Sequence, residues 1–248
     1  MANRSYLFAA SQVPETFFDR PEFIWGLSEW AYDLPLAYQL LVSDNTRACA
    51  SLSFKPMDAA NPPLAIAGSA AGGLARLTKL LDLLARSPAG EAHAEFMAAC
   101  SETKRFLDEN TDNYFYLETA ELDCMGTEVL HEAIDGHLAS IRHFAALVDQ
   151  LTPGNIEAHI APGGALEGVM SELGRFEERA LPTLGIANWT NVLYLAPRDK
   201  EDFDPADYSD DADQDDTPVI APIPPHAEPL SGAGPKGSFW SRLFKRRS

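Results

Sequence analysis

The chain has 248 residues, of which 46% are hydrophobic, and it contains three widely separated cysteines. This length suits one globular domain with an extension, and cysteines without a CxxC spacing favour neither a disulfide framework nor a zinc site. Since the sequence has no long apolar run and no secretory pattern at its start, we expect a protein of the reducing cytoplasm.

The net charge of −18 is distributed unevenly. Residues 1–197 hold 26 acidic and 12 basic side chains, and residues 199–216 hold ten acidic side chains and one lysine. Residues 234–248 hold five basic side chains and no acidic one. An acidic folded part repels phosphate backbones, so we expect it not to bind nucleic acid. The charge favours a cationic protein partner, or it serves solubility alone.

The first predicted elements are two strands and a helix. Residues 4–10 form a short strand with Tyr6 and Phe8 on one face, and the aromatic residues 22–30 form a second, largely buried strand. Residues 33–43 predict a helix that Asp33 caps, with Pro35 in its first turn.

The following elements alternate between strands and helices. The pattern predicts a strand over 64–68, a leucine-rich helix over 74–86, helices over 91–100 and 101–108 (the second capped by Ser101), a strand over 113–122, a long helix over 126–151, a weaker helix over 165–181 and a last strand over 188–197. We therefore expect an α/β or α+β fold in residues 1–197, with a small sheet of about four to five strands packed with helices.

The pattern changes at residue 198. Residues 198–237 are rich in Asp, Pro, Ala and Gly and hold few large apolar groups, which predicts a disordered linker that is first acidic and then proline-rich.

Residues 238–248 form a basic, aromatic tail. On a helix, the apolar side chains of this tail would form one stripe with basic neighbours, a pattern that docks in a partner's groove or rests on an anionic membrane. The partner-binding residues predicted here are Phe239, Trp240, Arg242, Leu243, Phe244, Lys245 and Arg246. The alternative is a disordered end that aids solubility or folds back onto the acidic linker.

A second predicted recognition surface consists of Glu29 and Asp33. These carboxylates lie among aromatic residues that mostly suit a core, but they could also line an acidic cleft for a cation or an arginine-rich loop. The glycines in the segment 68–73 match neither nucleotide-binding spacing, and they favour a tight strand-to-helix connection over an anion site. The histidines of "HEAIDGH" lie six residues apart and on different helix faces, so we expect no metal site. The sequence has no recognisable nucleophile motif either, and we expect no cofactor and no catalytic residue.

Three stretches of the chain resemble one family of uncharacterised bacterial proteins: "MANRSYLF", "GLSEWAYDLPLAYQLLVS" and the "LAIAG" strand with its leucine-rich helix. Members of that family begin "MANRSYLY" and carry an "SEW-YD-P--Y--L-S" stretch. The resemblance covers most of residues 1–196, and this chain departs from it at Phe8, where Tyr is usual, and in the linker and tail. It implies a cytoplasmic bacterial protein and transfers no activity and no site residue.

The sequence as a whole favours a non-enzymatic, cytoplasmic protein-binding module of an immunity or regulatory type, with the tail as a second contact. Two alternatives stay open. One is an enzyme of unknown reaction with a small-molecule site near Gly68–Gly73, and the other is peripheral membrane association through the tail.

Overall fold

The computed structural model describes residues 3–57, 61–91, 94–126, 130–167, 169, 183–186 and 188–208. The fold belongs to the α+β class and is built on a five-stranded sheet of order β2-β1-β5-β4-β3, in which every neighbouring pair is antiparallel. The strands are β1 (Arg4–Ala10), β2 (Ile24–Ala31), β3 (Arg47–Ala50), β4 (Leu64–Ser69) and β5 (Tyr114–Glu118).

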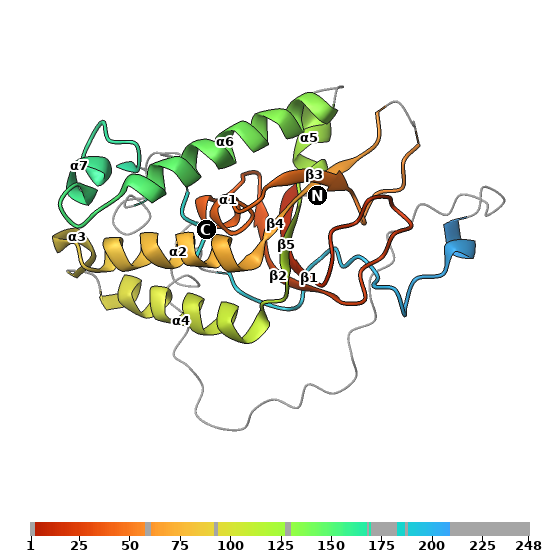
Figure 1. Ribbon diagram of the computed structural model, residues 1–248, viewed down its shortest axis with the longest axis horizontal. Helices are drawn as coiled ribbons and strands as arrows, with labels where there is room; N and C mark the ends of the chain where they lie inside the picture. The colour runs from red at the N-terminus through yellow and green to blue at the C-terminus, as the bar shows by residue number, and fades with distance from the viewer. Residues whose placement is uncertain are drawn as a thin grey trace, which may run out of the picture. The chain divides into compact units, whose positions relative to one another are not determined.

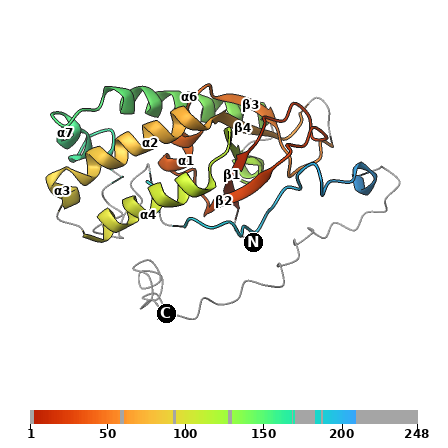
Figure 2. The same ribbon diagram turned by 60° about the horizontal axis from the view of Figure 1, so that its bottom comes forward.

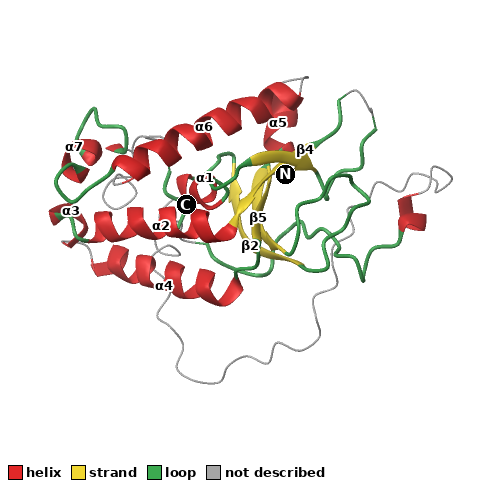
Figure 3. Cartoon of the chain, viewed as in Figure 1, coloured by secondary structure: helices red, strands yellow, loops and turns green. Residues whose placement is uncertain are grey.

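The helices gather on one side of the sheet and long loops gather on the other (Figures 1 and 3). The helices are α1 (Leu36–Leu41), α2 (Ala70–Ala85), α3 (Pro88–Glu91), α4 (Ala94–Asn110), α5 (Ala120–Gly126), α6 (Leu130–Gln150) and α7 (Ile156–Ile160), and a 3₁₀ turn, η1, covers Pro205–Tyr208. In both ribbon views α2 lies between α4 and α6 (Figures 1 and 2). The sheet therefore has a helix face and a loop face.

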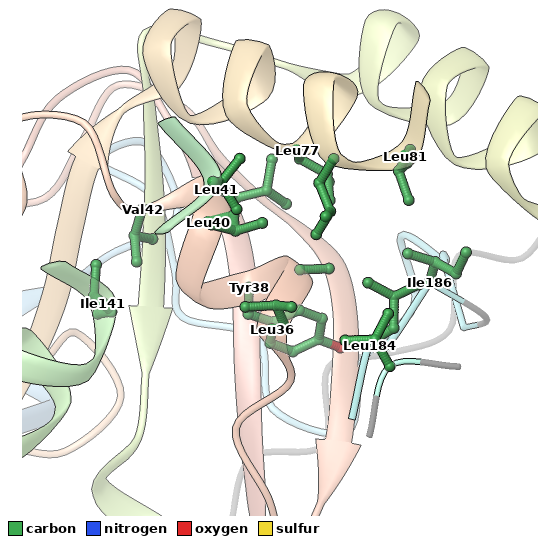
Figure 4. Packing of buried hydrophobic residues seen from close by; sticks show 14 of the residues in the cluster. Leu36, Tyr38, Leu40, Leu41, Val42, Leu77, Leu81, Ile141, Leu184 and Ile186 are labelled. Carbon is green, nitrogen blue, oxygen red and sulfur yellow. The ribbon is translucent and has the colours of Figure 1, made fainter. Parts of the chain in front are cut away.

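The core on the helix face surrounds α1, all of whose residues are buried. Side chains of α1 meet Leu77 and Leu81 of α2 and Ile141 of α6 in this core (Figure 4). The first N–H groups of α1 are satisfied from far along the chain, because Leu36 N donates to Thr183 O at 2.7 Å and Ala37 N to Leu184 O at 2.9 Å.

The predicted cap of this helix is therefore wrong. The Asp33 Oδ1 atom accepts a hydrogen bond from Leu34 N at 2.8 Å instead. No side chain caps α1, and Pro35 stands at the cap position rather than in the first turn.

A smaller second core lies on the loop face. Its members alternate along the strands, as a strand with two buried faces requires, and they are Tyr6, Phe8, Ala10, Cys49, Leu52, Ala65, Ala67 and Tyr116. Tyr6 and Phe8 thus share one face, as the sequence predicts.

Most predicted elements are confirmed with shifted ends. The strands over 4–10, 22–30, 64–68 and 113–122 correspond to β1, β2, β4 and β5, and the leucine-rich and long helices correspond to α2 and α6. The helices predicted over 91–100 and 101–108 form the single helix α4. Ser101 does not begin a new helix, because its hydroxyl donates to Met97 O one turn earlier at 2.9 Å.

Two strand predictions differ from the structure. β3 was not predicted, and residues 188–197 form no strand within the described part. The latter segment follows the edge of β2, where Thr190 N donates to Leu27 O at 2.9 Å, but its other bonds there involve side chains, such as Tyr194 N to Glu29 Oε2 at 2.7 Å. A ladder needs alternating backbone pairs, so none forms. The helix predicted over 165–181 lies mostly outside the described residues.

Candidate functional site

The two carboxylates predicted to form a recognition surface have separate partners. Glu29 lies on β2, where its Oε1 atom is 3.3 Å from Arg4 Nε and its Oε2 atom accepts from Tyr194 N. The Arg4 guanidinium also lies 5.0 Å from the centroid of the Tyr194 ring. Asp33 binds the backbone of the next residue. Glu29 thus fastens residues 188–197 to the edge of the sheet, and the structure does not join the two carboxylates in one site.

The aromatic residues around these carboxylates mostly belong to the core. Tyr38 is fully buried, with its hydroxyl 2.6 Å from Ser28 Oγ. Trp25 and Trp30 pack half-buried against the core of the helix face. Tyr32 is the exception, since 58% of it is exposed.

The glycine segment 68–73 packs tightly against the chain that follows α1. A Cβ on Gly73 would lie 1.8 Å from Leu41 O, and a Cβ on Gly72 would lie 2.3 Å from the carboxyl carbon of Asp44. The Asp44 carboxylate therefore fills the space beside the first turn of α2, where an anionic ligand would have to sit. The glycines serve close packing at this connection.

The predicted tail residues, Phe239 to Arg246, lie outside the described residues, as does the linker from residue 209 on. Residues 198–208, which the sequence places at the start of the linker, are described, and they contact the loop between β1 and β2. We call residues 198–208 the strap. Lys200 N donates to Pro21 O at 2.9 Å, and the Lys200 ammonium pairs with Glu22.

Aromatic rings hold the strap against this loop. The guanidinium carbon of Arg20 lies against two rings, 4.4 Å from the centroid of Phe17 and 4.0 Å from that of Phe203. The ring of Tyr208 packs 5.1 Å from Phe17 and 5.2 Å from Phe203. Arg20 is 4% exposed and donates through Nη1 to Leu52 O at 2.7 Å. Its Nε and Nη2 atoms have no partner among the described residues.

A cleft of about 690 Å³ opens next to this loop, along the outer edge of β3. Its walls combine one stretch of the loop after β1, the whole of β3 and a set of proline residues that flank the loop between β3 and β4. The lining residues are Val13, Pro14, Glu15, Thr16, Phe17, Arg47, Ala48, Cys49, Ala50, Ser51, Pro56, Pro62, Pro63 and Leu64. The cleft is thus mainly apolar, with Glu15 and Arg47 as its charged side chains.

A buried carboxylate organises the floor of the cleft. Glu118, at the end of β5, accepts hydrogen bonds from Ser51 Oγ at 3.0 Å, Leu52 N at 2.9 Å and Ser53 N at 3.2 Å. The hydroxyl of Tyr116 lies 2.5 Å from the same carboxylate. These four donors come from the turn that follows β3 and from the neighbouring position on the same face of β5. Glu118 therefore fixes the turn that carries Ser51 into the cleft.

Burial controls the ionisation of this group. It raises the pKa of Glu118 above its ordinary value, although the hydrogen bonds from Tyr116, Leu52, Ser51 and Ser53 act in the opposite direction. Burial also raises the pKa of the Cys49 thiol, which lines the cleft. Cys49 is therefore protonated at neutral pH and lacks the thiolate that a nucleophile needs.

A histidine–aspartate pair lies between α5 and α6. His137 Nε2 is 2.7 Å from Asp123 Oδ1, and the other oxygen of Asp123 accepts from Thr119 Oγ1 at 2.7 Å. Within the described ranges, no three His, Cys, Asp or Glu side chains come together as metal ligands would. The pair ties α5 to α6.

A family described as a domain of unknown function, DUF7822, matches residues 11–158. The match spans more than half of the chain. The chain belongs to this family. The family match agrees with the expected membership of an uncharacterised family, while the N-terminal string that suggested it lies before the matched region.

The family description names no activity, and the other comparisons add none. No curated protein matches the chain significantly, and no solved structure does so. Among the described residues, no helix is both long and apolar enough to cross a membrane. The cleft and Glu118 fall inside the DUF7822 region, whereas β1 and the strap fall outside it.

Sequence reasoning missed the cleft and Glu118. A signal for Glu118 was present, because the alternation of "YFYLE" places it on the same face as Tyr116. The cleft had no comparable signal, since its walls come from three segments that only the sheet topology brings together.

Proposed function

We propose that this protein is a non-enzymatic, cytoplasmic protein-binding module whose partner is a cationic protein. The surface that receives the partner consists of the cleft and of the acidic rim beside it. We define the acidic rim as residues 13–23 together with the strap. In this proposal the basic, aromatic tail, residues 238–248, supplies a second, tethered contact.

The observation that carries the proposal is the charge of the acidic rim. It holds eight acidic side chains and three basic ones, a net charge of −5. Two of the three cations are paired within the rim, Arg198 with Asp207 and Lys200 with Glu22, and the third, Arg20, is buried. Glu15 and Glu201 are exposed and make no side-chain hydrogen bond or ion pair with described residues. Such carboxylates attract a cationic partner at long range and pair with it on contact.

Exposed aromatic rings support the same class of partner. Phe18 is 52% exposed and packs edge-on against Phe17 and Phe203, so its ring is held in place within the acidic rim. Phe23, at the end of the same loop, is 58% exposed. A fixed aromatic face among carboxylates suits the guanidinium of arginine, which stacks on rings and pairs with acids.

The proposal is tested with matched charge reversals in the full chain. The rim variant carries Glu15→Lys, Glu201→Lys and Asp202→Lys, and the control variant carries Glu95→Lys, Glu102→Lys and Glu132→Lys on exposed positions of α4 and α6. Both variants change the net charge equally. Each immobilised protein is exposed to lysate, retained proteins are identified by mass spectrometry, and the retained protein is then purified and titrated calorimetrically.

We expect the wild type and the control to bind one basic protein, and the rim variant to bind it at least about tenfold more weakly, a difference of about 1.4 kcal/mol. Equal binding by all three proteins, or retention of acidic proteins only, would refute the proposed function.

A further inference from the structure

The direction of the backbone groups of β3 follows from its pairing with β4. Ser51 N donates to Pro63 O just beyond the strand, so positions 51 and 63 form a hydrogen-bonded pair. In an antiparallel ladder such pairs alternate with pairs whose N–H and C=O groups point outward. The register joins Cys49 to Ala65 and Ala50 to Leu64. The backbone groups of Ala48 and Ala50 therefore point away from the sheet.

One of these two outward positions is occupied. Ala50 N donates to Pro14 O at 3.3 Å, so the loop after β1 already pairs with the edge at this point. Ala48 is exposed, and its outward N–H and C=O have no hydrogen-bond partner within the described residues. Unpaired groups on a sheet edge are a template for another extended chain.

The space in front of Ala48 is the cleft described above. Four prolines line it, and a proline has no N–H that could compete for the edge carbonyl. The apolar walls would receive side chains that alternate along an extended segment. The edge of β3 is therefore open at Ala48, where its backbone groups can form hydrogen bonds and the cleft borders them.

We propose that an extended segment of the cationic partner adds to β3 as a sixth strand and pairs with the N–H and C=O of Ala48. This inference rests on the proposed function and names the binding mode. The negative charge beside this edge determines which kind of chain can pair with it. A second copy of this chain would bring an equal acidic rim and another net charge of −18 to the same edge, whereas a basic segment is attracted by the net charge of −5 of the acidic rim, of which Glu15 lines the cleft together with one cation, Arg47.

The test removes the outward N–H and changes the cleft lining only at position 48. Ala48→Pro is compatible with an edge strand because the lost N–H faces away from β4, and Ala48→Ser is the matched control that keeps the N–H. The probe is a fluorescein-labelled peptide of about eight residues with alternating lysine and valine, titrated by anisotropy against the full chain. A second peptide carries N-methyl groups on alternate residues, which removes the reciprocal hydrogen bonds that the peptide N–H groups would donate to the C=O of Ala48. Circular dichroism and the Tm report folding of each variant.

We expect the wild type and Ala48→Ser to bind the peptide equally, Ala48→Pro to bind it at least about tenfold more weakly, and the N-methylated peptide to lose binding to the same extent. The N-methylated peptide decides the question alone if Ala48→Pro does not fold.

Equal binding of both peptides overturns the sixth-strand mode. If the rim variant still loses affinity in that case, the proposed function stands. If the rim variant also binds equally, both fail. A concentration-dependent dimer of the full chain that Ala48→Pro abolishes would make a second copy the occupant and overturn the inference.

Discussion

Glu118 illustrates how one buried charge can shape a surface that it does not reach. Its carboxylate is fully enclosed, yet the three donors of the 51–53 turn converge on it, and that turn borders the cleft. Removing the carboxylate would leave several buried donors without an acceptor, which costs more than one hydrogen bond. The turn, and with it the cleft floor, depends on this side chain.

Glu118→Gln should change how stability depends on pH. Because burial raises the pKa of Glu118 in the folded state, the contribution of this group is complete below its unfolded value, near 4.5, and is lost as the pH rises through the folded value. Glutamine at position 118 has no titratable group, so the variant lacks this pH-dependent contribution. The free energy of unfolding of the variant minus that of the wild type should therefore increase as the pH rises above about 4.5, whatever the constant offset between them.

Urea unfolding at a series of pH values measures this difference. Glu95→Gln, at an exposed position of α4, is the control for the loss of a surface carboxylate. Parallel curves for Glu118→Gln and the wild type would show that Glu118 has the same affinity for protons in both states.

At the scale of elements, the sequence predicts those whose periodicity is long and apolar. β1, β2, β4, β5, α2 and α6 all have such patterns. β3 is not predicted because it is only four residues long, and two of them, Arg47 and Ala48, are exposed. It also follows Asn45, whose positive φ of 49° marks a tight turn rather than a strand start.

Long-range contacts explain the remaining errors. The cap of α1 comes from Thr183 and Leu184, which no local signal connects to residues 33–43. The composition of the strap predicts a linker, but distant aromatic contacts hold it in place, because Phe203 and Tyr208 pack on Phe17. In each case tertiary packing overrides a local pattern.

Two glycine substitutions on helices should have opposite effects. Gly73→Ala in α2 places a Cβ 1.8 Å from the carbonyl oxygen of Leu41, a backbone atom that cannot turn aside, and should lower the free energy of unfolding by about 2–3 kcal/mol or more. Gly136→Ala in α6 meets no atom within 4 Å and should raise it by about 1 kcal/mol through helix propensity. Chemical denaturation measures both. A stabilising Gly73→Ala would contradict the close approach of α2 to the end of α1.

At the scale of the whole molecule, excess negative charge is the dominant feature. Residues 1–197 carry a net charge of −14, and the strap continues the excess. Like charges at this density oppose the compact state while they favour solubility and fast encounter with cations. The stability of the protein and its recognition of a cationic partner thus both depend on the excess of negative charge.

Salt should therefore stabilise the isolated protein. Raising the ionic strength from about 0.01 M to about 0.15 M shortens the screening length from about 30 Å to about 8 Å, so the repulsion among surface carboxylates weakens and the Tm should rise. The control variant with lysines at positions 95, 102 and 132 has a smaller excess of negative charge, and its Tm should rise less. Calorimetric scans at both ionic strengths compare the two proteins. A Tm that falls with salt in the wild type would indicate that ion pairs outweigh the repulsion.

The central position of β1 has a practical consequence for anyone who prepares this domain. β1 lies between β2 and β5, yet it precedes the region that defines the family, and the residues that satisfy the start of α1 come after that region. A recombinant fragment cut at residues 11 and 158 would separate β2 from the rest of the sheet and uncap a wholly buried helix. Expression boundaries drawn from the family match alone should yield insoluble material, whereas a fragment that retains residues 3–208 keeps every described contact.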